Sequence, residues 1–535
     1  MTGRHAGRGR LGVKHVLAAA ALAVVVVVPG AAAEQAPRLQ VVSLDRPVFS
    51  PNGNGINDTV TLHTNAAPGT LIGLRAYVWG GRLEGWKRIR TGVSSTKPDV
   101  TWGGTKASGS KVRDGTYQLT VCYKDPGHRL PPLPGPVRPG KAEASVRNPP
   151  WNSSGCATPH VVRVERLAAF VDSTGSFNPG DKLPIVVSAD RGQYSVSFEH
   201  DCTAGSEVQM TFSDEGSVHV PLGDPPGLYH AVAGDPAGDE FRAPVVVRSG
   251  LPLDKPEPHT ALVVWPYLSW RAYNDYDADL NGIPDSWYQF WRQRRVSLKA
   301  PILRNGVEDD HKAAEPFSRW LCARNPRTQQ ITDVELGGLP LSTLRRYSAI
   351  VFPGHTEYYE PHTWDLLKQY RDEGGNLVIL QANPFYRQVR IDAKHNAVVM
   401  TDFDARQGRS DFALAGVGYD GCCFPKSRAA PYVAASGRDY DRVRWLYRGT
   451  GIGPGQAFGV ANSESDRIDP ELTPHDHVVA AEAIMRGKRG VVNATMVWSR
   501  AGKGQVFATG NYTFLRMGRG ITFKLLDNVW AKLVG

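Results

Sequence analysis

The residues best suited to chemistry lie in one short segment, where His355, Glu357, Tyr358 and Tyr359 fall within five consecutive positions. An imidazole beside a carboxylate can act as a general base, because imidazole titrates near neutral pH and the carboxylate can hold one tautomer. A glutamate flanked by phenols can instead bind a hard cation such as ferric iron, since such ions prefer oxygen donors. The structural alternative is that His355 and Glu357 only satisfy a turn and begin the next helix. The pattern leaves these interpretations open.

A strand and a helix must position these side chains. Residues 349–352 form an apolar run without alternation, which predicts a strand buried on both faces in a parallel sheet covered by helices. Residues 361–373 follow with a helical period, a proline at the start and two glycines after the end. Ligands of such sheets bind at the carboxyl ends of the strands. We therefore expect His355 and Glu357 at the end of a central parallel strand, with Tyr273 in the same cleft.

Several familiar catalytic signatures are missing from the sequence. It contains no GxSxG, no HExxH, no GxxxxGK[ST], and no GxGxxG after a strand. The strand–turn–helix at 349–372 has the order of a nucleophile elbow, but neither serine nor cysteine occupies its turn. Covalent catalysis from that turn is therefore not expected.

A second chemical motif lies directly after Tyr273. Residues 277–285 fit the pattern DxDxNGxxD, in which alternating oxygen side chains and a glycine turn can wrap calcium. The segment resembles thrombospondin type 3 and EF-hand-like loops. The alternative is an acidic surface turn without an ion. The residues expected to bind calcium are Asp277, Asp279, Asn281 and Asp285.

The beginning of the chain predicts export. A basic stretch, an apolar run and a segment of small residues at 31–33 form the pattern of a secretory signal peptide over residues 1–33. No later stretch approaches the length of a membrane span. The formal net charge of +10 is spread along the chain, without the basic and aromatic interleaving that indicates nucleic-acid binding. We expect a secreted protein with no nucleic-acid partner and no membrane span.

The cysteine content agrees with export. Six cysteines are an even number, which predicts disulfides in an oxidising compartment, with fifteen possible connectivities. Cys422 and Cys423 are adjacent, and neighbouring cysteines more often pair elsewhere than with each other. Cys322 lies in a helical pattern and is a possible partner for one of them.

The mature chain divides into four parts. Residues 39–125 show short alternating strands, residues 126–159 are a linker rich in proline and glycine, and residues 160–250 show a second series of short strands. From residue 258 to 535 the strands alternate with helices. The fold class predicted is two all-β sandwiches followed by an α/β three-layer domain with a mainly parallel sheet.

The first part resembles a known family of modules. Its opening Phe-Ser-Pro-Asn-Gly-Asn-Gly-Ile-Asn-Asp at 49–58, the Trp-Gly-Gly at 102–104 and the Asp-Gly-Thr-Tyr at 114–117 resemble landmarks of FlgD-like immunoglobulin modules. The resemblance implies a β-sandwich accessory module.

The last part resembles the large (beta) subunit family of N,N-dimethylformamidase. Its landmarks are Ser-Trp-Arg-Ala-Tyr-Asn at 269–274, Thr-Asp at 332–333, Gly-His-Thr-Glu-Tyr at 354–358, Gly-Gly-Asn-Leu at 374–377, Asn383, Tyr386, Gly-Thr-Gly at 449–451, Glu464 and Asp466. The family resembles a class I glutamine-amidotransferase-like fold without its cysteine nucleophile, preceded by an immunoglobulin-like domain. In its characterised member, iron held by tyrosines and a glutamate activates water against an amide.

The resemblance implies a role for each matching residue. Tyr273 and Glu357 would hold iron, His355 would transfer a proton and Glu464 would be a second acid or base. The residues implied to bind substrate are Asn274, Tyr358 and Asn383. Thr356 and Tyr359 depart from the family motif GHDEYW, and Lys-Ala-Pro-Ile at 299–302 stands where the family often has Arg-Pro-aromatic. No second tyrosine ligand can be placed.

Two functions follow from these observations. The first is a secreted hydrolase of an amide-like C–N bond, with a metal as a candidate cofactor, acting on a small or cell-envelope-derived amide. The second is a non-catalytic secreted protein that binds carbohydrate or the cell envelope with the same fold.

Overall fold

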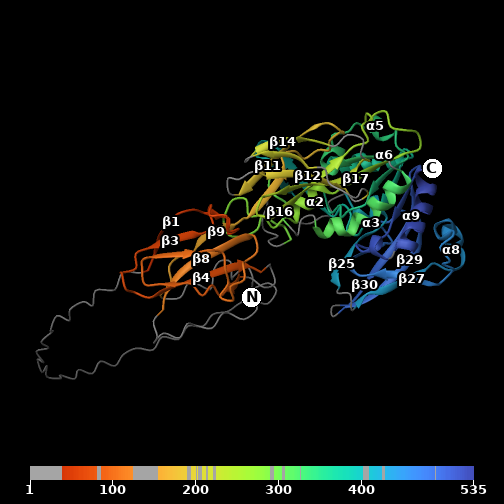
Figure 1. Cartoon of the computed structure of the whole chain (residues 1–535). Coiled ribbons are helices and arrows are strands. Elements are labelled where there is room, and N and C mark those ends of the chain that lie inside the picture. The colour runs from red at the N-terminus through yellow and green to blue at the C-terminus, as the bar shows by residue number, and fades with distance from the viewer. Residues whose placement is uncertain are drawn as a thin grey trace, which may run out of the picture. The chain divides into compact units, whose positions relative to one another are not determined.

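The structure is a computed structural model of the 535-residue chain (Figure 1). It describes residues 39–80, 86–124, 155–189, 194–200, 202, 208–212, 215–220, 225–288, 295–303, 308–325, 327–401, 409–424, 428–487, 490–517 and 519–535. The predicted signal peptide and most of the predicted linker lie outside these residues. In the part of the chain that the structure describes, no helix is both long and apolar enough to span a membrane.

The first set of strands, in red and orange in Figure 1, forms two sheets. The smaller sheet has the order β1 (Val41–Leu44), β3 (Val60–Thr64), β7 (Asp99–Trp102). The larger has the order β2 (Val48–Phe49), β9 (His160–Val164), β8 (Gly115–Tyr123), β4 (Ile72–Trp79), β5 (Trp86–Ile89), with β6 (Ser94–Ser95) on β4. Alternating apolar residues of both sheets pack into one buried cluster, as in a sandwich. Strand β9, which lies within the predicted second sandwich at 160–250, pairs with β8 here.

Two further antiparallel sheets enclose a second apolar cluster. One has the order β10 (Leu167–Val171), β11 (Lys182–Ala189), β14 (Glu215–His219). The other has the order β13 (Val208–Phe212), β12 (Tyr194–His200), β15 (Gly227–Gly234), β16 (Glu240–Val247). Both sets of strands are compatible with immunoglobulin-like sandwiches, as predicted.

A nine-stranded sheet organises the rest of the chain. Its order is β19 (Gln329–Thr332), β17 (Ala261–Trp265), β20 (Ala349–Phe352), β22 (Asn376–Ile379), β31 (Gly504–Ala508), β30 (Gly490–Ala501), β29 (Asp476–Gly487), β26 (Ala430–Ala434), β27 (Ala457–Ala461). The pairings from β19 to β31 are parallel, and those from β31 to β27 are antiparallel. The sheet is therefore mixed and not mainly parallel, because the long hairpin of β29 and β30 extends its parallel half.

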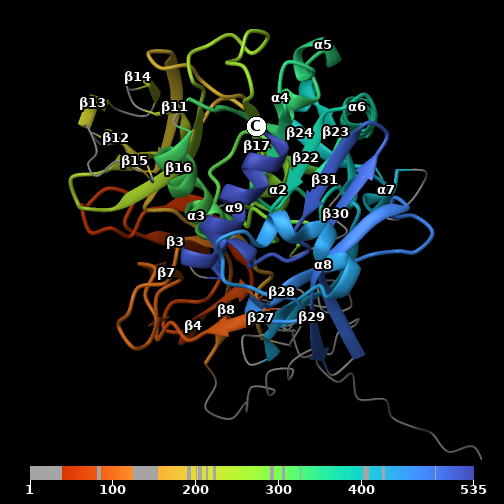
Figure 2. The ribbon, with the colours of Figure 1, turned by 90° about the vertical axis from the view of Figure 1, so that its right-hand side faces the viewer.

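Helices cover both faces of the parallel half. The helices of this part are α2 (Tyr267–Ala272), α3 (Glu308–Arg324), α4 (Asp333–Leu336), α5 (Leu341–Leu344), α6 (Pro361–Asp372), α7 (Asp411–Ala415), α8 (Gly437–Val443) and α9 (Arg519–Leu533). Of these, α8 packs on β29 in the antiparallel half. Alternate residues of β17 and β20 belong to two different apolar clusters, one with α3 and α9 and the other with α6. Helices α3 and α9 lie side by side in Figures 1 and 2, and Trp320 Nε1 donates to Asp527 between them at 2.8 Å. Burial on both faces explains the unbroken apolar sequences of these strands.

Two smaller sheets complete this part. One has the order β18 (Arg295–Ser297), β24 (Ala397–Met400), β23 (Arg387–Asp392), β21 (Tyr358–Tyr359). The other pairs β25 (Gly418–Phe424) with β28 (Ser463–Arg467).

Disulfides link distant segments of the described chain. Cys122 bonds to Cys156, and Cys202 bonds to Cys322 on α3. The predicted pairing of Cys322 with Cys422 or Cys423 is therefore wrong. The reason is tertiary, since the chain just after β12 packs against α3, where the Cys202 sulfur also lies 3.5 Å from the carbonyl oxygen of Ser318.

Candidate functional site

The turn after β20 carries His355 and Glu357 to the carboxyl ends of the parallel strands. A side chain at Gly354 would place its Cβ 2.5 Å from the ring of Pro266, which follows β17, so the close approach of the two strand ends requires glycine. The backbone N–H of Glu357 donates to the hydroxyl oxygen of Ser269 on α2 at 3.1 Å. The turn is therefore attached to the segment that leads to Tyr273.

Tyr273 follows α2 and shares a site with both residues of the turn. Its hydroxyl donates to Oε2 of Glu357 and lies 3.4 Å from Nε2 of His355. Burial and the nearby Glu357 raise the pKa of Tyr273 well above its usual value, and burial does the same to the pKa of Tyr358. Both tyrosines are consequently neutral phenols near neutral pH. The ring of Tyr358 packs edge-on against Tyr273, with the ring centroids 6.0 Å apart.

Glu464 enters the same site from β28, far along the chain. Its Oε2 lies 3.3 Å from Nε2 of His355, and Oε2 of Glu357 lies 3.5 Å from the same nitrogen. The side chain of His355 is only 2% exposed, whereas that of Glu464 is 16% exposed. One buried ring nitrogen thus faces two carboxylates and a phenol. An imidazole in this setting can take a proton from one partner and pass it to another.

Asn383 holds Glu464 in place. It follows β22 in the left-handed conformation, with φ of +57°. Its backbone N–H donates to Oδ1 of Asp466 at 2.8 Å, and its side-chain Nδ2 donates to Oε1 of Glu464 at 3.2 Å. Glu464 and Asp466 are two residues apart on one strand, so they project from the same face. Asp466 is fully buried, and this burial raises the pKa of its carboxyl group well above the usual value.

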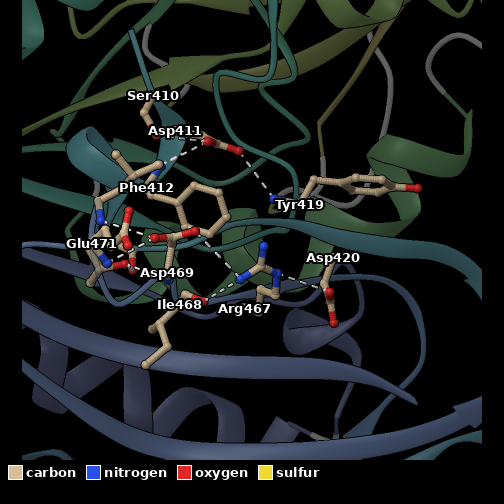
Figure 3. A network of polar contacts seen from close by, with 12 residues as sticks. Ser410, Asp411, Phe412, Tyr419, Asp420, Arg467, Ile468, Asp469 and Glu471 are labelled. Carbon is tan, nitrogen blue, oxygen red and sulfur yellow. Dashed lines mark hydrogen bonds and ion pairs between the residues drawn. The ribbon is translucent and has the colours of Figure 1, made fainter. Parts of the chain in front are cut away.

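A polar network keeps the strand of Glu464 in register with its neighbour (Figure 3). The guanidinium group of Arg467 lies 3.3 Å from Oδ1 of Asp420 and sits over the ring of Phe412, 5.3 Å from its centroid. The carboxylate of Asp411 accepts a hydrogen bond from the backbone of Tyr419 at 3.3 Å. These contacts connect α7, β25 and β28, and so they fix the strand that presents Glu464.

The structure therefore brings together Tyr273, His355, Glu357, Asn383 and Glu464, with Tyr358 packed beside them. Asn274 is placed differently, since its amide bonds to main-chain atoms of residues 276, 301 and 303. These bonds position the loop, and the role of Asn274 in substrate binding stays a prediction.

Three residues of this site received no role from the sequence. Ser269 and Asp466 lie within the family motifs. Asp466 is two residues from Glu464, and this spacing on a strand indicates that both side chains project from the same face. Tyr512 packs edge-on against His355, with the centroids 5.4 Å apart, and its backbone N–H bonds to Glu464 at 3.0 Å. No local pattern marks Tyr512, because only the fold brings it to the site.

The site contains only part of the iron-binding set that the family resemblance implies, which is two tyrosines and a glutamate. Tyr273 and Glu357 offer two adjacent oxygen atoms of the kind that a hard cation prefers. Residues 299–302, where the family often has an aromatic residue, contain no tyrosine. Ile302 in this segment is apolar, 6% exposed and packed in the core beside α3, so it offers no oxygen donor. The implied set of two tyrosines and a glutamate therefore does not fit this segment.

The acidic loop after Tyr273 gathers its aspartates. Oxygen atoms of Asp277, Asp279 and Asp285 all lie within 4.8 Å of one another. The side chain of Asn281 instead bonds to Asp279 at 2.9 Å and to the backbone of Ile283 at 2.8 Å. The buried Arg163 of β9 donates to the hydroxyl of Tyr276 at 2.5 Å, which places the loop against the first set of strands.

The search of curated proteins found no match. Among solved structures, a ThuA-like protein from Bacteroides uniformis is 13% identical with a TM-score of 0.29, and the match covers 51% of this chain and 89% of that chain. The fibronectin(III)-like modules of Clostridium thermocellum CbhA are 16% identical with a TM-score of 0.12, covering 38% of this chain and 93% of that chain. These scores are too low to support an argument.

The family model described as "N,N-dimethylformamidase beta subunit-like, C-terminal" matches residues 189–517, which include every residue of the candidate site. The match covers more than half of the chain. This protein therefore belongs to the N,N-dimethylformamidase beta subunit-like family.

Proposed function

We propose that this protein is a secreted hydrolase of an amide-like C–N bond. The observation that carries the proposal is the position of His355 Nε2, within 3.5 Å of carboxylate oxygens from both Glu357 and Glu464. Hydrolysis of an amide needs a base for the attacking water and an acid for the leaving nitrogen. A histidine between two carboxylates can supply both in turn.

The reaction consumes one water molecule. His355 takes a proton from water, and the hydroxide oxygen forms a bond to the carbonyl carbon. The tetrahedral intermediate then releases the nitrogen, which receives the proton through Glu464 as the C–N bond breaks. A carboxylic acid and an amine are released. The neutral phenol of Tyr273 stands beside Glu357 as a hydrogen-bond donor.

Wider features of the molecule support the same proposal. The five parallel strands, with helices on both faces, support the amidotransferase-like arrangement for residues 258–535, and the strands within 39–125 support the FlgD-like module. The disulfides support secretion, since they persist in oxidising compartments.

A hydrolysis screen tests this function. Small formamides, acyl amides and peptidoglycan-derived amides are incubated with the purified mature chain, and amine release is measured. Release that is lost in His355→Ala supports the proposal. A protein that cleaves none of these amides but binds cell-envelope material would favour the non-catalytic binding protein.

We also propose that the loop at 277–285 binds calcium. Three carboxylates that converge within 4.8 Å repel one another unless a cation or a proton lies between them. The neighbouring Tyr273 would then be held by a stiffened loop. Melting temperatures with calcium and with a chelator test this proposal.

A further inference from the structure

The first set of strands has a face that does not belong to its core. Strands β8, β4 and β5 are neighbours in the larger sheet, and alternate residues of β4 point into the apolar cluster. The remaining residues project from the other side, together with the residues directly opposite them on β5 and β8. We call this side the arginine–tryptophan face, and it consists of Arg75, Tyr77, Trp79, Trp86, Arg88 and Gln118.

Nitrogen donors on this face lack partners. Nη2 of Arg75, Nε of Arg88 and Nε1 of Trp79 are buried atoms, and within the described part of the chain none of them has a hydrogen-bond partner. Arg75 is 6% exposed and Trp79 is 9% exposed. A buried N–H without an acceptor costs the folded state the free energy of its hydration. The face therefore offers donors to which the protein supplies no acceptor.

Two of these donors carry positive charges that repel each other. Burial lowers the pKa of the Arg88 guanidinium, and the neighbouring cations of Arg75 and Arg90 lower it further. Guanidinium groups bind carboxylate and phosphate groups through two parallel hydrogen bonds. An anion at this face would remove the repulsion and supply the missing acceptors.

The other residues of the face indicate a ligand built from sugars. The indole rings of Trp79 and Trp86 meet edge-on, with their centroids 5.3 Å apart. Such rings suit a ligand that is apolar on its ring faces and polar at its edges. Oε1 of Gln118, opposite Tyr77 on β8, is a buried acceptor with no hydrogen-bond partner among the described residues, and a hydroxyl group can satisfy it. Sugars with acidic substituents offer ring faces, hydroxyl groups and anions together.

The face can be reached from β5. This strand lies at one end of the described sheet, opposite β2. Trp86 and Arg88 are half-buried, and Arg90 directly after the strand is exposed. A polymer can therefore approach along β5 and bring its acidic groups to the donors of β4.

We propose that the arginine–tryptophan face binds an acidic polysaccharide, with Arg75 and Arg88 on its carboxylate or phosphate groups and the tryptophans against its sugar rings. The proposal does not depend on the hydrolase function, because no residue of the face belongs to the site around His355. Amide hydrolysis should be unchanged in variants of the face.

Binding of defined polymers to the full mature chain tests the inference. Biolayer interferometry gives the Kd for polygalacturonate, which carries carboxylates, for phosphomannan, which carries phosphates, for neutral dextran and for single-stranded poly(dT). We expect the wild type to bind an acidic polysaccharide more tightly than dextran or poly(dT), and the tighter of the two acidic polymers identifies the anion.

Variants locate the binding. Arg75→Met and Arg88→Met should each weaken it at least about tenfold, the scale of a hydrogen bond to a charged group. Without polymer, their melting temperatures should stay the same or rise, because each change removes a buried donor that has no acceptor. The control Arg113→Met removes the same charge at an exposed position of the same set of strands and should change the Kd by less than about twofold.

Each result supports or overturns the inference. Loss of binding in Arg75→Met and Arg88→Met without a lower melting temperature supports it. Binding of neither acidic polysaccharide, equal binding of dextran, or an equal loss in Arg113→Met overturns it. Lower melting temperatures in both variants also overturn it, because the donors would then stabilise the fold itself. Tighter binding of poly(dT) overturns it and assigns the face to single-stranded nucleic acid.

Discussion

Nε2 of His355 lies 3.3 Å from Oε2 of Glu464, although the two residues are 109 positions apart in the chain. The contact joins the turn after β20 to strand β28, and Asn383 supports it from a third segment. His355 also faces Glu357 in its own turn, so the proposed proton path joins two chain segments that only the folded molecule brings together.

The first prediction concerns proton transfer. His355→Ala and Glu464→Gln should each lower kcat/KM for a cleaved amide by about 10²–10⁴-fold, the usual contribution of general acid–base catalysis. The double variant should lose little more, because residues that act as one unit are not additive. Steady-state kinetics measures all three. His362→Ala, at an exposed histidine of α6, is the control. Fully additive losses would contradict a shared path.

The second prediction concerns a metal at Tyr273 and Glu357. Glu357→Gln keeps the shape and an acceptor for the Tyr273 hydroxyl but removes the charge. If these residues hold a cation, its content measured by elemental analysis should fall together with activity, while circular dichroism stays unchanged. His355→Ala should keep the metal. Glu373→Gln, at a surface ion pair with Arg345, is the control. Metal content unchanged in Glu357→Gln would place any metal elsewhere.

The third prediction concerns the acidic loop. Calcium that binds only the native state should raise the melting temperature. At a calcium concentration of 100 times the Kd, the free energy of unfolding rises by about 2.7 kcal/mol. The variant Asp279→Asn should change the melting temperature in chelator and the stabilisation by calcium in opposite directions. In chelator it relieves repulsion with Asp277 and Asp285 and raises the melting temperature, and in calcium it reduces the gain. Equal melting temperatures of the wild type in calcium and in chelator would exclude the site.

The fourth prediction concerns pH. Burial raises the pKa of Asp333 well above its usual value, and its carboxylate accepts a hydrogen bond from the backbone of Leu268 at the start of α2. The folded state then holds a proton that the unfolded state releases above about pH 4, so the free energy of unfolding falls as pH rises from there.

Asp333→Asn should remove this contribution. The variant loses one acceptor oxygen and is less stable at every pH, but its stability should decrease less steeply between pH 4 and pH 7. Urea unfolding at intervals of pH measures both slopes. Identical slopes would mean that the backbone N–H bonds around Asp333, which lower its pKa, cancel the effect of its burial.

The local elements were predictable because their signals are local. An apolar run without alternation at 349–352 predicted a fully buried strand, and β20 is buried at all four positions. Proline at 361 and the glycine pair at 374–375 predicted the ends of α6, which spans Pro361–Asp372. The family was recognised from short motifs, and the match over residues 189–517 confirms it.

The tertiary structure decided what depends on contacts between distant segments. The sheet is mixed, because β29 and β30 join its edge as a hairpin, and Cys322 pairs with Cys202, which no spacing rule foretells. Tyr512 and Asp466 reached the site only through strand pairing around β28 and β31. The sequence by itself determined which residues can donate, accept or carry a proton and which strands are buried. Their mutual distances were set by packing, because the burial that drives folding is not directional and leaves the choice of partners to the whole chain.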